Sequence, residues 1–144
     1  MAVTKTNDMA PLVRYRLARA LETLDEARLL FENGKLHGCV NRLYYACFYA
    51  VEALLHSEGR TASKHSGVQS LFNRWWVKPG RIPRDFGEFY NKMFSIRSAS
   101  DYGIDPQLER AQVEQWVQEA ERFVTTVSSQ IHGWLRANEP KSNA

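Results

Sequence analysis

Apolar residues recur every three or four positions along most of this chain, which is the spacing that places them on one face of an α-helix. No segment has the pattern of a strand. The spacing predicts four long helices and one short helix, at about residues 8–33, 37–58, 67–76, 84–102 and 106–137. We therefore expect an all-α fold, an up-and-down helical bundle, because consecutive helices with short connections usually pack antiparallel.

Residues with special backbone or capping properties mark the predicted ends of these helices. Asn33 and Gly34 tolerate the left-handed conformation that closes a helix, and residues 78–83 predict a loop. Candidate caps at the helix starts are Asn7 or Asp8, Ser63 or Ser66, and Asp105 followed by Pro106. We expect residues 1–144 to form a single domain, with about 7–137 ordered and 138–144 as a flexible tail.

The second predicted helix is apolar over nearly its whole circumference. Tyr44, Tyr45 and Tyr49 add to a stripe of aliphatic residues, and Ala46 and Ala50 are small enough to let neighbouring helices approach closely. Such a helix lies either at the centre of a bundle or under a second subunit. For at least two of these tyrosines we expect core packing, with the hydroxyl groups at the edge of the core.

Composition and residue spacing exclude several classes of protein. No apolar run approaches the ~20 residues that cross a bilayer, and the first residues lack the apolar core of a secretory signal. We therefore expect a cytoplasmic protein with no membrane partner. Cys39 and Cys47 are about 12 Å apart along the predicted helix, too far for a mutual disulfide. His37 and Cys39 have no second pair at ligand spacing, so we expect neither a metal nor a cofactor.

Positive charge is concentrated in the middle of the chain. The whole protein has a net charge of +3, whereas residues 60–100 contain eight basic and two acidic residues, a net charge of +6. Residues 101–144 contain seven acidic and four basic residues. A cation-rich middle fits an anion or nucleic-acid site, or an acidic protein partner; solvated surface charge explains it equally well.

Polar residues that can take part in chemistry follow the apolar stripe of the fourth helix. Arg97 and Asp101 are four residues apart, so they share one face of that helix, and Tyr102 follows directly. An exposed Arg–Asp pair at a helix end is the simpler explanation. His65 precedes the short helix and is the residue type best suited to carry a proton near neutral pH. If its segment folds over the end of the fourth helix, His65, Arg97 and Tyr102 form a composite site.

Several segments also resemble those of a known family. They are 42–50 (RLYYACFYA), 53–55 (ALL), 64–68 (KHSGV), Phe72, 77–83 (VKPGRIP) and 97–103 (RSASDYG). In order and spacing they are similar to the HEPN superfamily (higher eukaryotes and prokaryotes nucleotide-binding), specifically to its small stand-alone prokaryotic members. The resemblance implies a helical bundle that forms a homodimer, with the polar motif of the fourth helix near the dimer cleft.

The resemblance also implies a range of activities. Many HEPN proteins are metal-independent ribonucleases, in which an arginine is followed four to six residues later by a histidine. Arg97 matches the arginine, but Asp101 and Tyr102 stand where the histidine is expected, a pattern common in this branch. Many are toxins encoded beside a minimal nucleotidyltransferase that acts as antitoxin. Tyr102 is, by position, the tyrosine that such a partner would adenylylate.

Three functions are compatible with the sequence. The first is a nucleotide- or RNA-binding module that pairs with a nucleotidyltransferase, whose candidate binding residues are Arg97, Lys64, Tyr44, Tyr45 and Arg81. The second is a metal-independent endoribonuclease toxin, whose candidate catalytic residues are Arg97, Tyr102, His65 and Asp101. The third is a non-catalytic structural dimer, in which Arg97 and Asp101 form a buried pair that fixes the packing.

Overall fold

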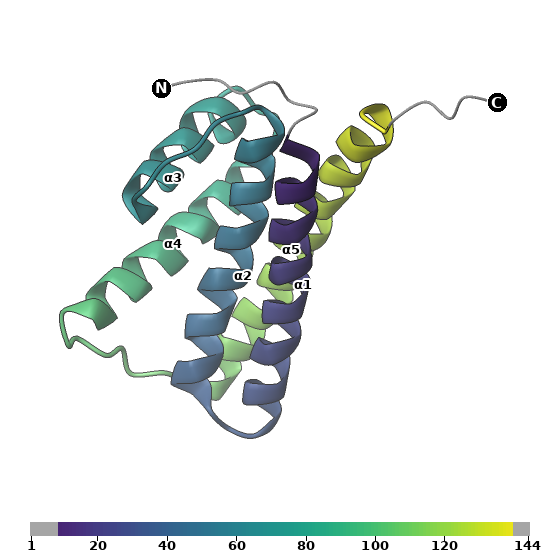
Figure 1. The fold of residues 1–144 in the computed structure, drawn as a ribbon. Coiled ribbons are helices and arrows are strands. Elements are labelled where there is room, and N and C mark those ends of the chain that lie inside the picture. The colour runs from purple at the N-terminus through teal and green to yellow at the C-terminus, as the bar shows by residue number, and fades with distance from the viewer. Residues whose placement is uncertain (1–8, 140–144) are drawn as a thin grey trace.

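The computed structural model describes residues 9–139 as a bundle of helices (Figure 1). The elements are α1 (Ala10–Glu32), α2 (Leu36–Ser57), α3 (His65–Phe72), the π-helical turn η2 (Asn73–Val77), α4 (Arg84–Asp101) and α5 (Arg110–Ala137). No residue between 9 and 139 lies in a strand, so the predicted all-α bundle of four long helices and a short one is confirmed. None of these helices is long and apolar enough to cross a membrane.

The helices α1 and α2 form an antiparallel hairpin, with α5 packed against both (Figure 1). The connection is short because α1 ends at Glu32, with Asn33 as its C-cap, and is closed by Gly34. The φ of Gly34 is 71°, a left-handed conformation that glycine adopts without strain. The predicted end of the first helix is thus confirmed. The predicted caps Asn7 and Asp8, and most of the predicted tail 138–144, lie outside the described residues.

Helix α2 is the central helix. It packs against α1 and α5 and also against α3 and α4 (Figure 1). Its buried residues come from all round the helix and include Leu43, Tyr44 and Val51. The chain's own helices therefore cover the apolar circumference of α2, and the central position accounts for it without a second subunit. Tyr44 lies in the core as expected, and Tyr45 and Tyr49 are half-buried and pack against it.

The short helix begins earlier than the sequence predicts. Helix α3 starts at His65, with Lys64 as its N-cap and no side-chain hydrogen bond there, so neither Ser63 nor Ser66 caps it. The reason lies in tertiary packing. The His65 ring lies against Phe48 of α2, with 4.4 Å between the ring centroids, and this contact anchors the first turn of α3.

The last helix begins later than the sequence predicts. Helix α5 starts at Arg110, with Glu109 as its N-cap, whereas the sequence pattern places the start at Pro106 with Asp105 as the cap. That prediction is wrong because residues 104–109 pass irregularly from α4 back to the start of α2 (Figure 1). Here the carbonyl oxygen of Pro106 accepts a hydrogen bond of 3.1 Å from His37 Nε2.

Helix α4 runs at an angle to α1 and α2, and its C-terminal end stands apart from them (Figure 1). Its first turns pack closely on η2 because Gly87 has no side chain: a Cβ at this position would lie 2.6 Å from Val77 Cγ1. The C-terminal half of α4 faces the start of α2 across a pocket. The angle of α4 therefore places Arg97 at the edge of this pocket.

Candidate functional site

Arg97 lies near the end of α4 and contacts α2. Its Nη2 donates a hydrogen bond of 2.9 Å to the Tyr45 hydroxyl, and its guanidinium lies over the Tyr45 ring, 5.4 Å from the centroid. Its Nη1 donates to the Asp101 carboxylate one turn further along α4. The side chain of Arg97 is 23% exposed. These contacts fix the direction of the guanidinium and still leave part of it open to a ligand.

His65, the first residue of α3, lies beside the same stretch of α2. Its Nδ1 is 3.1 Å from the Tyr44 hydroxyl oxygen, and its ring stands edge-on to the Tyr45 ring with 5.8 Å between centroids. Burial first, and the positive charge of Arg97 second, lower the pKa of His65 below its ordinary value. The imidazole is therefore neutral at pH 7 and able to accept a proton.

Tyr44 and Tyr45 are neighbours on α2 but hold different partners. Burial raises the pKa of Tyr44 to about 12, so its hydroxyl stays protonated and serves as a hydrogen-bonding partner for His65. Tyr45 is half-buried, and two guanidiniums approach its ring, those of Arg97 and of Arg42, the latter 5.0 Å from the centroid. Tyr44 thus positions the histidine, and Tyr45 positions the arginine.

The pair formed by Arg97 and Asp101 is exposed to solvent. The Asp101 side chain is 58% exposed, so the pair is not buried within one chain, and its burial between two copies, as in the structural-dimer hypothesis, stays a prediction. Exposed ion pairs contribute at most about 1 kcal/mol. An anionic ligand can therefore compete with Asp101 for the guanidinium.

Two further candidate residues lie next to the site in sequence but keep their side chains in solvent. Tyr102 is the C-cap of α4 and is 84% exposed. Lys64 is the N-cap of α3 and is also exposed. Of the expected composite of His65, Arg97 and Tyr102, the structure brings the first two residues together around Tyr45 and leaves the Tyr102 side chain in solvent.

Arg81 belongs to the other end of α2. Its Nη2 pairs with Glu58, the C-cap of α2, over 2.6 Å, and its guanidinium lies over the Trp76 ring at 3.5 Å. Glu58 follows Tyr44 by fourteen positions, which corresponds to roughly 21 Å at the α-helical rise of 1.5 Å per residue. The structure therefore does not bring Arg81 to the site around Arg97.

A further contact between an arginine and a tyrosine lies within the hairpin of α1 and α2. On α1, Arg19 lies over the ring of Tyr49, with 5.3 Å to the centroid. Planar guanidiniums held by aromatic rings are well suited to contact phosphate groups. Between residues 9 and 139, no group of three or more His, Cys, Asp or Glu side chains is arranged to hold a metal ion.

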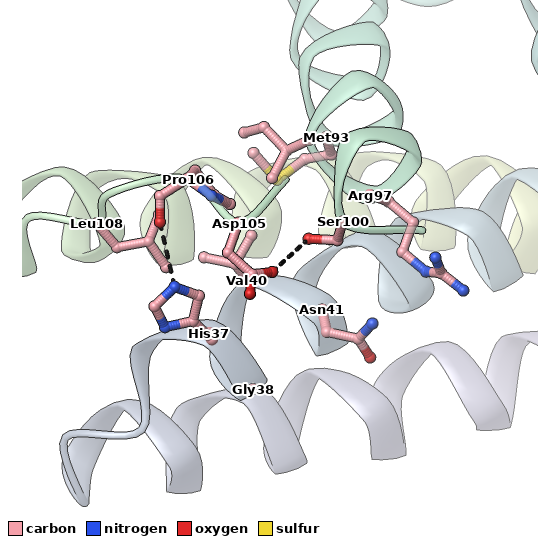
Figure 2. A pocket seen from close by; sticks show the side chains of 11 residues that line it. His37, Gly38, Val40, Asn41, Met93, Arg97, Ser100, Asp105, Pro106 and Leu108 are labelled. Atoms are coloured by element: carbon pink, nitrogen blue, oxygen red, sulfur yellow. Dashed lines mark hydrogen bonds between the residues drawn. The ribbon is translucent and has the colours of Figure 1, made fainter. Parts of the chain in front are cut away.

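A pocket of about 280 Å³ lies beside Arg97, between the start of α2, the second half of α4 and residues 105–108 (Figure 2). Its apolar side chains are Val40, Met93, Ile96, Pro106 and Leu108, and its polar ones are His37, Asn41, Arg97, Ser100 and Asp105. Apart from Arg97, none of these residues is a candidate site residue by sequence. In the sequence, only the turn-forming residues 103–106 mark this place, and their pattern predicts the start of a helix and not the wall of a pocket.

The fold and this site define a small all-helical protein in which an arginine and a neutral histidine lie around Tyr45, and in which the arginine also lines a pocket. Residues 13–130 match the family model of the HEPN domain. The chain is 44% identical over 131 residues to a UPF0332 protein of Thermotoga maritima. The aligned region covers 91% of this chain and 99% of the relative. It is 30% identical over 131 residues to a protein of Methanocaldococcus jannaschii named "Putative toxin", covering 91% and 97%. This chain belongs to the HEPN domain family, as the sequence resemblance implies.

Proposed function

We propose that this HEPN protein binds RNA or a nucleotide through a phosphate group, and that it is the toxin-like member of a pair with a minimal nucleotidyltransferase. The observation that carries the proposal is the setting of Arg97, whose guanidinium is held by the Tyr45 hydroxyl beside an exposed, displaceable carboxylate. Two relatives from Methanocaldococcus jannaschii bear the name "Putative toxin", which supports the toxin-like role.

Binding is tested with a labelled single-stranded RNA and fluorescence anisotropy, in the absence of metal ions. Arg97→Ala should weaken binding about tenfold or more, because a charge-assisted contact contributes about 1.5–3 kcal/mol. Arg81→Ala is the matched control, since it removes the same group at the other end of α2 and should leave the affinity unchanged. Melting curves establish that both variants fold. An equal loss in both variants would mean that overall charge, and not the site, binds RNA.

The proposal includes two protein partners. A second copy of the chain would bring two Arg97 side chains to one cleft and so increase the positive charge available to a phosphate. The nucleotidyltransferase would inactivate the toxin by adenylylating Tyr102, whose side chain is open to solvent. Sedimentation tests the homodimer. Intact mass after incubation with the transferase and ATP tests the modification, and a mass increase that persists in Tyr102→Phe would contradict this choice of tyrosine.

A second candidate function is metal-independent cleavage of RNA, and the position of His65 favours it. Cleavage needs a base for the 2′-hydroxyl, positive charge for the phosphorane and an acid for the leaving 5′-oxygen. Arg97 supplies the charge, and the lowered pKa of His65 makes it a proton acceptor at pH 7. The Tyr44 hydroxyl can donate to His65 Nδ1 or accept from it. When it accepts, the lone pair of Nε2 is available as the base, and the imidazolium formed by taking the 2′-hydroxyl proton can then give that proton to the leaving 5′-oxygen.

Cleavage is tested by incubating RNA with the wild type, His65→Ala and Arg97→Ala in the presence of a chelator. A ribonuclease of this kind should leave 2′,3′-cyclic phosphate ends, and both substitutions should abolish them. Expression of the wild type should also arrest growth, and Arg97→Ala should relieve the arrest. RNA that stays intact with the wild type, together with binding that depends on Arg97, would leave the protein as a binding module without this activity.

A further inference from the structure

Phosphate binding by Arg97 does not explain the pocket beside it. The pocket encloses about 280 Å³. Pockets for small molecules typically enclose ~300–1,000 Å³, so this one suits a single flat ring system and not a larger ligand. Arg97 is one of its lining residues, so a ligand in the pocket would lie against the arginine side chain (Figure 2).

The walls of the pocket combine apolar surface with a few polar atoms. Val40 and Met93 are buried and offer apolar surface from α2 and α4. Figure 2 shows Ser100 and Asp105 facing each other between these helices, with Asn41 nearby. Asn41 Oδ1 accepts a hydrogen bond of 2.9 Å from Arg42, so the amide N–H groups of Asn41 are the part left to donate.

Asp105 is the acidic residue of the pocket. Its Oδ1 accepts a hydrogen bond from Ser100 Oγ at 3.4 Å, which is long for a hydroxyl donor. An ionised carboxylate accepts several hydrogen bonds and donates none. The lone pairs of Asp105 are therefore available to a ligand that presents N–H groups, and a phosphate would be repelled from this position.

We propose that the pocket binds the base of the nucleotide whose phosphate Arg97 holds, and that Asp105 makes the pocket favour guanine. The inference rests on the proposed function, because it assigns the phosphate to Arg97. Guanine presents two adjacent donors, N1–H and the 2-amino group, to a carboxylate. Adenine and cytosine present an amino group beside a ring acceptor, and uracil presents a single ring N–H between two carbonyl groups. The cationic and anionic side chains of the site thus match the two ends of a guanine nucleotide.

The test compares the affinities of 5′-GMP, 5′-AMP, 5′-CMP, 5′-UMP and ribose 5-phosphate by isothermal titration. The wild type should bind 5′-GMP about tenfold more tightly than ribose 5-phosphate, which has no base. Ser100→Leu should reduce 5′-GMP binding to the level of ribose 5-phosphate, because the larger side chain fills the pocket. Ser95→Leu, on an exposed position of the same helix outside the pocket, should leave all five affinities unchanged.

Asp105→Asn is the second variant, because Asp105 is exposed and the change preserves its shape. It should remove the preference for 5′-GMP over 5′-AMP and leave ribose 5-phosphate binding as it was. Equal affinities for all five ligands, all weakened by Arg97→Ala, would refute the base pocket and keep the phosphate site. No binding of any of the five ligands, together with RNA binding that depends on Arg97, would refute this inference alone. Binding of the ligands and of RNA that Arg97→Ala leaves unchanged would refute the proposed function and with it this inference.

Discussion

Replacing Gly87 by alanine tests the contact that sets the position of α4. The added Cβ would lie 2.6 Å from Val77 Cγ1 and 2.9 Å from Cγ2, well inside the ~3.5–4.0 Å of ordinary carbon contacts. Val77 is β-branched, so its side chain has few alternative rotamers. Overpacking of this kind costs about 1–3 kcal/mol, and the better helix propensity of alanine offsets about 1 kcal/mol. We expect Gly87→Ala to lower the free energy of unfolding by about 1 kcal/mol.

Gly133→Ala in α5 is the matched control. The nearest atom to a Cβ at Gly133 is Arg136 Nη2, at 4.0 Å, so helix propensity should raise the free energy of unfolding by about 1 kcal/mol. Urea denaturation followed by circular dichroism measures both values. The double variant Val77→Ala/Gly87→Ala should lose less free energy of unfolding than the sum of the losses in the two single variants, because alanine at position 77 removes the clash. Equal stabilities of the Gly87→Ala and Gly133→Ala proteins would refute the reasoning.

Burial and charge determine how three further side chains respond to pH, substitution and a thiol reagent. Burial lowers the pKa of His56 below its ordinary value of ~6.5, so the unfolded chain binds a proton more tightly than the folded chain. The free energy of unfolding should therefore be highest above pH ~6.5 and should decrease as the pH falls below that value. Melting at pH 7.5 and pH 5.5 should show the loss, and His56→Gln should reduce it; an unchanged difference would count against His56. Asp101→Asn removes a competing anion and should strengthen RNA binding up to about fivefold by anisotropy, whereas weaker binding would contradict the competition. Burial raises the pKa of the Cys39 thiol to about 11 and that of Cys47 further, so neither should react with a thiol reagent at pH 8 before the protein unfolds. Rapid reaction of the native protein would disprove this.

The helices and one half of the site are predictable from sequence because they depend on local spacing. Each helix buries a continuous apolar stripe, and the fourth helix ends within a residue of its predicted end. Arg97 and Asp101 pair because residues four apart on a helix are neighbours, whatever the rest of the chain does. The position of the pair at a helix end already favours exposure to solvent, whereas the degree of exposure depends on how far α4 stands from α2.

The other half of the site depends on tertiary packing. The hydrogen bond between Tyr44 and His65 joins residues 21 positions apart and needs α3 to lie on α2. Asp105 and Pro106 have the sequence of a helix start, yet the bond from His37 to the Pro106 carbonyl holds them in an irregular segment. Local propensity cannot report these contacts, because tertiary interactions override it.

The angle of α4 connects these observations to function. Close packing at Gly87 brings the first turns of the helix onto η2, while its other end stands away from the start of α2 and leaves the pocket beside Arg97. Gly87 and Arg97 are ten residues apart, which corresponds to about 15 Å along the helix. A folded Gly87→Ala protein should therefore bind RNA more weakly than the wild type, although Gly87 contacts no part of the site. Unchanged binding would mean that contacts of residues 104–109 with α2, and not the packing of α4 on η2, set the position of Arg97.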